Sequence, residues 1–347
     1  MVTGSCKRRM NKYWDKKMIE GKKIFVTGGA GFIGSTIVGR LVENNEIIIY
    51  DNLARDSLKD TIYRDHRNIK LVQGDILDYD KLARSMKGAE IIIHLAAIAG
   101  IDTVIRSPIT TMKVNLLGTV NLLEAASSQD NLERVIDFST SEVFGAYAFR
   151  SEENDTTALG AVGNARWTYA VSKLAAEHLA YSYYTEKKMP TLSIRPFNIY
   201  GPGQTGEGAI HHFIANALQN HDLVIRGDGD QIRSWCYIDD LVDGVMLCLK
   251  KPKAIGQCFN IGNPRGTTTI HGLALAIVRA TYSKSKIVYV PKDYADVELR
   301  IPSIEKAKKL LGFEAKIGLE EGLRRTATWY YGKIFSDKTH KAEYIAR

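Results

Sequence analysis

The stretch Thr27–Gly34, with the sequence TGGAGFIG, decides the fold of this chain. It follows the apolar run Lys23–Val26 and precedes Ser35–Val42, so the pattern predicts a strand, a tight turn and a helix. Glycine allows the backbone to turn sharply and to approach a ligand closely, and the N-terminus of a helix offers free N–H groups to a phosphate. The pattern is typical of a dinucleotide site, although an ordinary tight turn is the alternative that a glycine cluster leaves open.

A second predicted strand supplies the acid that such a site needs. Glu46–Tyr50 is a mostly β-branched run that ends at Asp51, about twenty residues beyond the glycines. A carboxylate there would hold the ribose diol of an adenosine and would repel a 2′-phosphate. The sequence therefore favours NAD over NADP as the cofactor.

The composition is that of an ordinary globular protein with one large or two modest domains: 347 residues, 45% hydrophobic and 25% charged. The net charge of +8 is concentrated at the ends, because residues 1–20 carry six Lys/Arg and two Asp/Glu, and residues 332–347 carry four and two. We expect solvated tails there and a nearly neutral body between them. No nucleic-acid partner is therefore expected.

No segment of the sequence predicts a membrane span, a secretory signal or a metal site. The longest apolar stretch, Ile91–Ile101, contains His94 and is too short to cross a bilayer. The N-terminus has no apolar signal core, and the four cysteines show no metal-binding spacing. We therefore expect a cytoplasmic protein with reduced thiols, no metal and no membrane partner.

Strand-like and helix-like runs alternate through the first two-thirds of the chain. Ile69–Gln73, Ala89–Leu95 and Arg134–Ser139 are strand-like, and a helical pattern covers roughly Pro108–Ser128. This alternation predicts an α/β fold, a doubly wound parallel sheet of the Rossmann type. Ligands of such sheets bind outside the carboxyl ends of the strands.

The character of the sequence changes after about Pro196. Glycines and prolines cluster, and helical runs such as Ala209–Gln219 and Ile304–Leu311 alternate with shorter strands. We expect a smaller C-terminal lobe that binds the substrate. The predicted organisation is a basic tail (1–20), an NAD-binding domain (21–196), a mainly substrate-binding lobe interleaved with it (197–331) and a C-terminal tail (332–347).

Two further motifs carry candidate chemistry. In Tyr169–Lys173, YAVSK, a phenol and an ammonium lie on one face of a helix, and a fixed positive charge would lower the pKa of the phenol. In Phe138–Gly145, FSTSEVFG, a strand ends in three hydroxyls and an acid. Each motif alone has an ordinary alternative, a solvated surface pair or a set of caps. Their occurrence in this order behind a glycine turn favours a catalytic site over a purely structural explanation.

With these motifs the sequence resembles the extended short-chain dehydrogenase/reductase family, in particular its NAD-dependent nucleotide-sugar epimerases and dehydratases, over roughly residues 22–331. Gly34 also falls on a glycine position of that family, and Thr140, Tyr169 and Lys173 match its catalytic residues. The resemblance implies cofactor-binding residues at Gly28, Gly31, Phe32, Ile33, Asp51, Asn52, Asp75, Ile76, Leu95, Ala96, Ala97, Asn115, Ser139, Tyr169 and Lys173.

The resemblance implies a shared first step on a nucleotide-diphosphate sugar. Tyr169 would remove the proton of the sugar 4-hydroxyl while a hydride leaves C4 for the nicotinamide. Thr140 would bind the same oxygen, and Lys173 would bind the nicotinamide ribose. Substrate contacts are implied at Ser141, Asn198, Arg233 and Arg300. Relatives commonly pair as homodimers through two long helices, which would here be Pro108–Ser128 and Arg166–Lys188.

The 4-keto sugar made in that step can be epimerised, dehydrated or decarboxylated, and Glu142 is the residue that bears on the choice. UDP-glucuronate decarboxylases resemble this chain in the string STSEV, in Arg166–Tyr169 and in Asp296–Ile304, where Arg300 would lie near the sugar carboxylate. Decarboxylation is therefore the narrow first choice. A 4-epimerase and a 4,6-dehydratase remain open, as does a non-enzymatic NAD-sensing or RNA-binding scaffold.

Overall fold

The computed structural model describes residues 19–292 and 296–335. Its centre is a parallel sheet of seven strands in the order β12-β7-β5-β4-β1-β2-β3. This arrangement confirms the predicted doubly wound α/β fold. The strands are β1 (Lys23–Thr27), β2 (Glu46–Asp51), β3 (Ile69–Gln73), β4 (Ile91–His94), β5 (Arg134–Phe138), β7 (Thr191–Pro196) and β12 (Cys258–Ile261).

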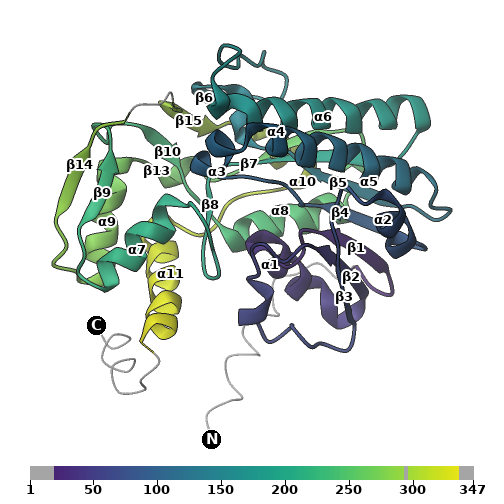
Figure 1. Cartoon of the computed structure of the whole chain (residues 1–347), viewed down its shortest axis with the longest axis horizontal. Coiled ribbons are helices and arrows are strands. Elements are labelled where there is room, and N and C mark those ends of the chain that lie inside the picture. Colours follow the sequence, from purple (N-terminus) through teal and green to yellow (C-terminus); the bar gives the residue numbers. More distant parts are fainter. Residues whose placement is uncertain (1–18, 293–295, 336–347) are drawn as a thin grey trace, which may run out of the picture.

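The central strands are nearly continuous buried runs because helices cover both faces of the sheet (Figure 1). Alternate residues of each strand enter two hydrophobic clusters, so Ile24 and Ile47 face one layer while Phe25 and Ile48 face the other. One layer contains α1 (Phe32–Leu41) and α8 (Ile238–Lys250). The other contains α2 (Tyr79–Met86), α5 (Gly118–Ser127) and α6 (Thr168–Lys187).

The helical pattern predicted over Pro108–Ser128 is one rod with an irregular middle. It consists of α4 (Pro108–Met112), a π-helical turn (Lys113–Leu117) and α5. The short helix α3 (Ile101–Arg106) precedes it. Pro108 is the first residue of the rod. A backbone N–H at this position has no partner within the helix, so proline, which lacks the N–H, costs no hydrogen bond there.

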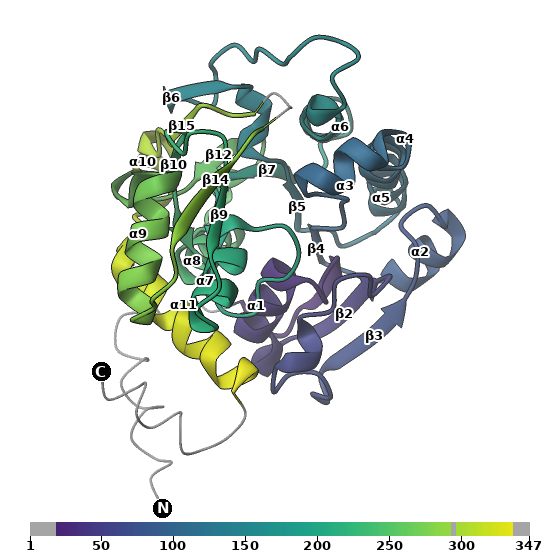
Figure 2. The same cartoon turned by 60° about the vertical axis from the view of Figure 1, so that its left-hand side comes forward.

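A smaller lobe lies to one side of the main sheet, as the views in Figures 1 and 2 show. Its four-stranded sheet has the order β13-β10-β15-β6, and two strand pairs, β11-β8 and β14-β9, complete it. The strands are β6 (Tyr147–Ser151), β8 (Ile199–Tyr200), β9 (Leu223–Arg226), β10 (Ile232–Ser234), β11 (Cys236–Tyr237), β13 (Thr267–Thr269), β14 (Ile287–Val290) and β15 (Leu299–Pro302). Its helices are α7 (Ala209–Leu218), α9 (Ile270–Thr281) and α11 (Leu319–Ile334), whereas α10 (Glu305–Leu311) packs against β12 and α8 of the main unit.

The two units exchange strands across the sequence boundary at Pro196. Strand β6, from the N-terminal part, joins the small sheet beside β15, and β12, from the C-terminal part, joins the main sheet beside β7. Helix α11 runs to Ile334, past the predicted start of the C-terminal tail at residue 332. The remainder of both predicted tails, residues 1–18 and 336–347, lies outside the described residues.

None of the helices within residues 19–292 and 296–335 combines the length and apolarity needed to span a membrane.

Candidate active site

The glycine turn after β1 is packed so closely that side chains are excluded from it. Gly28 has a φ of +68°, and a Cβ there would lie 2.7 Å from the amide nitrogen of Ala96. A Cβ on Gly34 would lie 2.3 Å from the carbonyl oxygen of Gly28. The turn therefore brings the start of α1 against the end of β4, with backbone N–H groups at the helix N-terminus available to a phosphate.

The carboxylate of Asp51, at the end of β2, is tied to this turn. One oxygen accepts a hydrogen bond from the Ala30 N–H at 3.0 Å and the other accepts from the Leu53 N–H at 2.7 Å. Burial raises the pKa of Asp51, while the two backbone hydrogen bonds act in the opposite direction. Its remaining lone pairs can accept hydrogen bonds from a ribose diol, so the turn and this acid fit a dinucleotide.

The other predicted adenosine contacts follow β2 and β3. The side chain of Asn52 accepts a hydrogen bond from the Ala54 N–H at 3.0 Å, and that of Asp75 accepts from the Leu77 N–H at 2.9 Å. Ile76 is buried. These residues shape two loops at the same edge of the sheet as the glycine turn.

The side chain of Asn115 is hydrogen-bonded to the loop after β4. Its side chain exchanges two hydrogen bonds with the backbone of Ile98, at 2.8 and 3.1 Å, and donates a third to the Ser172 hydroxyl at 3.1 Å. The N–H of Leu95 donates to the Thr27 carbonyl at 3.0 Å, which fixes the start of the same loop. Asn115 thus links the loop containing Ala96 and Ala97 to α6.

The predicted catalytic residues come from two adjacent segments. Thr140 begins the 3-10 turn Ser141–Phe144 and accepts a hydrogen bond from the Glu142 N–H at 3.2 Å. The Thr140 side chain also acts on the phenol of Tyr169, which lies in the first turn of α6, in the direction that lowers the pKa of the phenol. Thr140 is therefore both a cap and a neighbour of the phenol.

The pKa of Tyr169 differs from the prediction. The sequence pattern predicts a pKa lowered by Lys173, whereas the structure has it raised, so that prediction is wrong for this arrangement. Burial is the main cause, and the charge of Glu142 adds to it; the Thr140 side chain opposes both. The Lys173 ammonium lies 4.0 Å from a carboxylate oxygen of Asp137, which offsets part of its charge.

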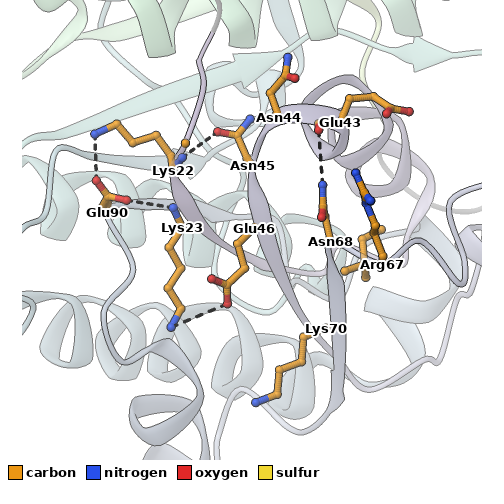
Figure 3. A pocket seen from close by; sticks show the side chains of 12 residues that line it. Lys22, Lys23, Glu43, Asn44, Asn45, Glu46, Arg67, Asn68, Lys70 and Glu90 are labelled. Atoms are coloured by element: carbon orange, nitrogen blue, oxygen red, sulfur yellow. Dashed lines mark hydrogen bonds and ion pairs between the residues drawn. The ribbon is translucent and has the colours of Figure 1, made fainter.

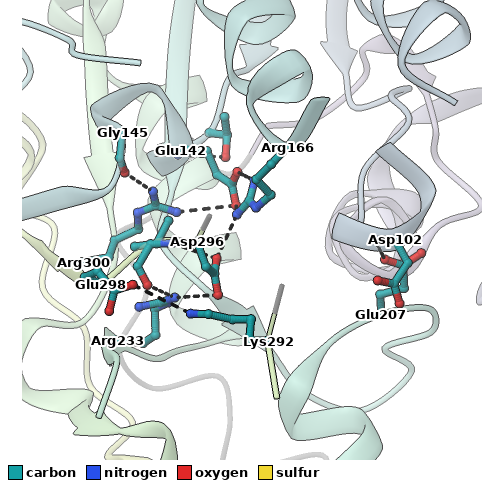
Figure 4. Close-up of polar contacts among 12 residues, drawn as sticks. Asp102, Glu142, Gly145, Arg166, Glu207, Arg233, Lys292, Asp296, Glu298 and Arg300 are labelled. Atoms are coloured by element: carbon teal, nitrogen blue, oxygen red, sulfur yellow. Dashed lines mark hydrogen bonds and ion pairs between the residues drawn. The ribbon is translucent and has the colours of Figure 1, made fainter. Parts of the chain in front are cut away.

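Glu142 is held between two arginines. Arg166 donates to its two oxygens at 2.5 and 3.0 Å, and Arg300 lies 3.5 Å away (Figure 4). Burial would raise the pKa of Glu142, but the two guanidinium groups outweigh burial and hold the pKa below its usual value. Burial lowers the pKa of Arg300 to about 10, despite the opposing effect of Glu142.

The strand register explains how a third arginine joins them. Arg233 of β10 lies directly opposite Arg300 of β15. Two like charges in such a pair repel each other unless anions lie between them. Asp296 supplies one: its carboxylate lies 3.3 Å from Arg166 and 3.6 Å from Arg233. We call Arg166, Arg233, Arg300, Glu142 and Asp296 the arginine cluster.

The arginine cluster gathers three of the predicted residues and adds two. Arg300 also donates to the Gly145 carbonyl at 2.7 Å, which ties β15 to the turn containing Ser141. Arg166 and Asp296 appear in the quoted motifs, but no role is predicted for either. A basic residue three positions before Tyr169 is the one sequence signal for Arg166.

Asn198, a predicted substrate contact, lies at a bend between two loop segments of the small lobe. It has a φ of +42°, and its amide donates to the Ser234 carbonyl at 2.9 Å. Its own carbonyl accepts from the Cys236 N–H at 3.2 Å. The side chain therefore joins two loop segments of the small lobe, and no contact with the arginine cluster is seen among the described residues.

Two cavities lie away from these residues. The larger, about 810 Å³, is at the amino ends of β1, β2 and β3, where Lys22 pairs with Glu90 and Lys23 with Glu46 (Figure 3). The smaller, about 370 Å³, lies beside α6, β7 and β12. Within the described ranges, no group of three His, Cys, Asp or Glu residues is placed to hold a metal ion.

Comparison with known proteins identifies a family whose model matches this chain, and several similar proteins. Residues 24–262 match the model of the NAD dependent epimerase/dehydratase family. The chain is 34% identical to UDP-N-acetyl-alpha-D-glucosaminuronate decarboxylase of Bacillus cytotoxicus, over 89% of this chain and 98% of the relative. It is 33% identical to UDP-glucuronic acid decarboxylase 6 of Arabidopsis thaliana, over 91% and 89%.

A solved structure provides a further comparison. The crystal structure of UDP-glucuronic acid 4-epimerase from Bacillus cereus, in complex with UDP-glucuronic acid and NAD, superposes with a TM-score of 0.81 at 28% identity. The match covers 88% of this chain and 98% of that one.

Proposed function

Because this chain belongs to the NAD-dependent epimerase/dehydratase family, we propose that it decarboxylates a nucleotide sugar of the UDP-glucuronate type. The cofactor is NAD, which when bound accepts a hydride from the sugar and can return it. Gly28 and Gly31 would lie against its pyrophosphate and Asp51 against its adenosine ribose. The fit of the glycine turn and of Asp51 supports this assignment.

Thr140, Tyr169 and Lys173 carry the proton chemistry of the proposed reaction. Tyr169 accepts the proton of the sugar 4-hydroxyl, and Thr140, whose side chain acts on the phenol, holds the same sugar oxygen. Lys173 binds the nicotinamide ribose and stabilises the phenolate. Since the phenol is buried and its pKa raised, the phenolate requires positive charge beyond that of Arg166, which the nicotinamide ring of bound NAD would supply.

The arginine cluster is the observation that supports a uronate, rather than an uncharged sugar, as the substrate. It holds three guanidinium groups against two carboxylates, and all three arginines are buried. Buried charges are retained when they are paired, so the surplus positive charge is suited to one further anion. Glu142 follows Thr140 by two residues, and Thr140 is the proposed contact of the sugar 4-hydroxyl, so we infer that the cluster lies at the sugar end of the substrate. The sugar carboxylate is the anion at that end.

Decarboxylation follows from oxidation at C4 of such a substrate. The C6 carboxylate is then a β-keto acid, and the electrons of the C5–C6 bond can pass into the ketone as carbon dioxide leaves. Glu142 is ion-paired with Arg166 and Arg300, so it is suited to orienting the sugar and Arg300. A dehydratase must remove the C5 proton, and a carboxylate that acts as this base should not be ion-paired with two arginines as Glu142 is.

Incubation with UDP-glucuronate, followed by mass measurement of the product, tests the proposal. Loss of carbon dioxide supports it. An unchanged mass with an altered sugar would instead assign 4-epimerisation, the activity that the name of the Bacillus cereus neighbour states for its uronate substrate. Loss of water would assign a dehydratase. If no nucleotide sugar is turned over while RNA is bound with a steep salt dependence, the protein is a scaffold rather than an enzyme.

We also propose that the protein is a homodimer. Apolar side chains are exposed on the helical rod of α4 and α5 and on α6, among them Ile109, Leu117, Val171 and Tyr181. Pairing of these helices with those of a second copy would cover them. Light scattering across a concentration series measures the mass. The predicted cytoplasmic location stays a prediction, to be checked by cell fractionation.

A further inference from the structure

Asp137 of β5 lies beside the Tyr169–Lys173 pair, and the reaction proposed above gives it no role. The residue is 1% exposed, and one carboxylate oxygen lies 4.0 Å from Lys173 Nζ. Neither oxygen has a hydrogen-bond partner in the part of the chain that the structure describes. A carboxylate in such a place is strongly unfavourable unless a cation compensates it. Its counter-charge must therefore be found among its neighbours.

The residues in register with Asp137 on the two neighbouring strands carry no positive charge. Asp137 is in register with His94 of β4 and with Ser193 of β7, which is uncharged. Both ring nitrogens of His94 are hydrogen-bonded to hydroxyls, those of Thr27 at 2.7 Å and Thr119 at 3.0 Å. Burial lowers the pKa of His94 to about 3, so the ring is neutral.

Helix α6 presents three ionisable groups to this position, which are Tyr169, Lys173 and Glu177. Glu177 is paired with Arg195 of β7 through hydrogen bonds of 3.0 and 2.6 Å. Among the described residues, Lys173 is thus the cation that balances Asp137. The lysine that the proposed reaction needs is shared with a buried acid.

We propose that Asp137 is a positioning residue whose buried carboxylate holds the Lys173 ammonium in place, one helical turn from Tyr169. The inference rests on the proposed function, in which Tyr169 is the base. The negative charge of Asp137 offsets that of the ammonium and opposes a second negative charge on the phenol.

The titration of the two groups supports this coupling. Among the causes that raise the pKa of Tyr169, burial is the largest, followed by Glu142 and then Asp137. Burial raises the pKa of Asp137 itself to about 6, against the effect of Lys173. Asp137 is therefore half ionised near pH 6, and its full effect on Tyr169 is reached about one pH unit higher.

The variant Asp137→Asn, loaded with NAD, tests the inference because it removes the charge and keeps the size. Two quantities are measured against pH: the rate of NADH formation in a single turnover of UDP-glucuronate, and the tyrosinate absorbance. Subtracting the titration of the corresponding Tyr169→Phe protein isolates the signal of Tyr169. We expect the midpoint of the rate profile and the midpoint of the tyrosinate titration both to fall by about one pH unit. On the acid side of the rate profile, that shift is about a tenfold gain in rate.

Asp240→Asn is the matched control. Asp240 is equally buried, but its carboxylate accepts hydrogen bonds from the Lys316 and Ile317 N–H groups at 2.9 and 3.1 Å, away from Tyr169. We expect that variant to lose stability without a shift of either midpoint. Should Asp137→Asn fail to fold, Asp137→Leu gives the same test with an apolar side chain of similar width.

The outcomes separate the inference from the function on which it rests. A tyrosinate midpoint unchanged in both Asp137 variants, or moved equally by the Asp240 variant, overturns the role of Asp137. If UDP-glucuronate is not turned over by any of these proteins but the tyrosinate midpoint falls as expected, the proposed substrate is wrong and the role of Asp137 stands.

Discussion

The glycine turn and the arginine cluster are built in opposite ways. The turn is one contiguous stretch whose backbone atoms contact each other, such as Gly34 with Gly28. The arginine cluster joins side chains from segments far apart in sequence, with Glu142 meeting Arg300 across 3.5 Å. The first depends on the absence of side chains and the second on buried charges that must balance. Substitutions in the two regions should therefore fail differently.

The largest effect is expected at the phenol of Tyr169, the proposed base. Tyr169→Phe keeps the ring and removes the proton acceptor, so turnover should fall by about 10²–10⁴-fold. NAD content after purification should be unchanged, because the glycine turn is intact. The measurements are the initial rate of product formation and the NAD released on denaturation. Turnover equal to that of the unaltered protein would remove Tyr169 from the reaction.

Glu142→Gln probes the charge balance of the arginine cluster. It leaves Arg166, Arg233 and Arg300 with Asp296 as their remaining carboxylate. We expect the step after oxidation to slow by about 10²-fold, a size typical of the loss of one charged group that orients a substrate. NADH should then accumulate on the enzyme, which its near-ultraviolet absorbance reports. Normal product formation would make Glu142 structural and favour a 4-epimerase.

Gly34→Ala probes the turn, where the added methyl would meet the Gly28 carbonyl oxygen at 2.3 Å and the Gly29 Cα at 2.6 Å. Both contacts are to backbone, so neither atom can rotate away. Overpacking of this kind costs about 1–3 kcal/mol of unfolding free energy, and we expect NAD to be lost as well. The control is Gly318→Ala, where nothing lies within 4 Å of the added carbon. Equal denaturation midpoints for the two variants would contradict the packing argument.

The glycine turn could be predicted from the sequence and the arginine cluster could not, because the turn is local and the cluster is not. The strand, turn and helix around Gly28 are local, so periodicity and glycine spacing were sufficient to predict them. The arginine cluster depends on the register that sets Arg233 opposite Arg300, and strand order in the small lobe has no local signature. Arg166 and Asp296 were missed for this reason. The predicted pKa of Tyr169 was wrong because helix spacing revealed Lys173 but not the burial or the carboxylates around it.

Asp137→Asn should change how stability depends on pH. The pKa of Asp137 is raised to about 6 in the folded state, so the folded protein binds its proton more tightly than the unfolded chain does. The stability that this proton provides is present at low pH and is lost as pH rises through 6. The variant should therefore be more stable than the original by about 1–3 kcal/mol at pH 8, with no difference near pH 4. Urea unfolding at the two pH values measures this, and a pH-independent difference would contradict it.

The smallest effect is expected at Glu207, which joins the two lobes from outside both regions. Its carboxylate accepts hydrogen bonds from the Asp102 N–H at 2.8 Å and the Thr103 N–H at 3.1 Å, at the N-terminus of α3 (Figure 4). Glu207→Gln keeps an acceptor but loses the charge that favours a helix N-terminus, so about 0.3–1 kcal/mol of unfolding free energy should be lost. Glu320→Gln is a suitable control, since Glu320 also lies in the first turn of a helix, α11. Because Glu207 contacts the backbone of α3 directly, hydrogen exchange should increase in α3 for Glu207→Gln and stay unchanged for Glu320→Gln. Equal exchange in α3 for both variants would show that the contact between the lobes does not depend on this carboxylate.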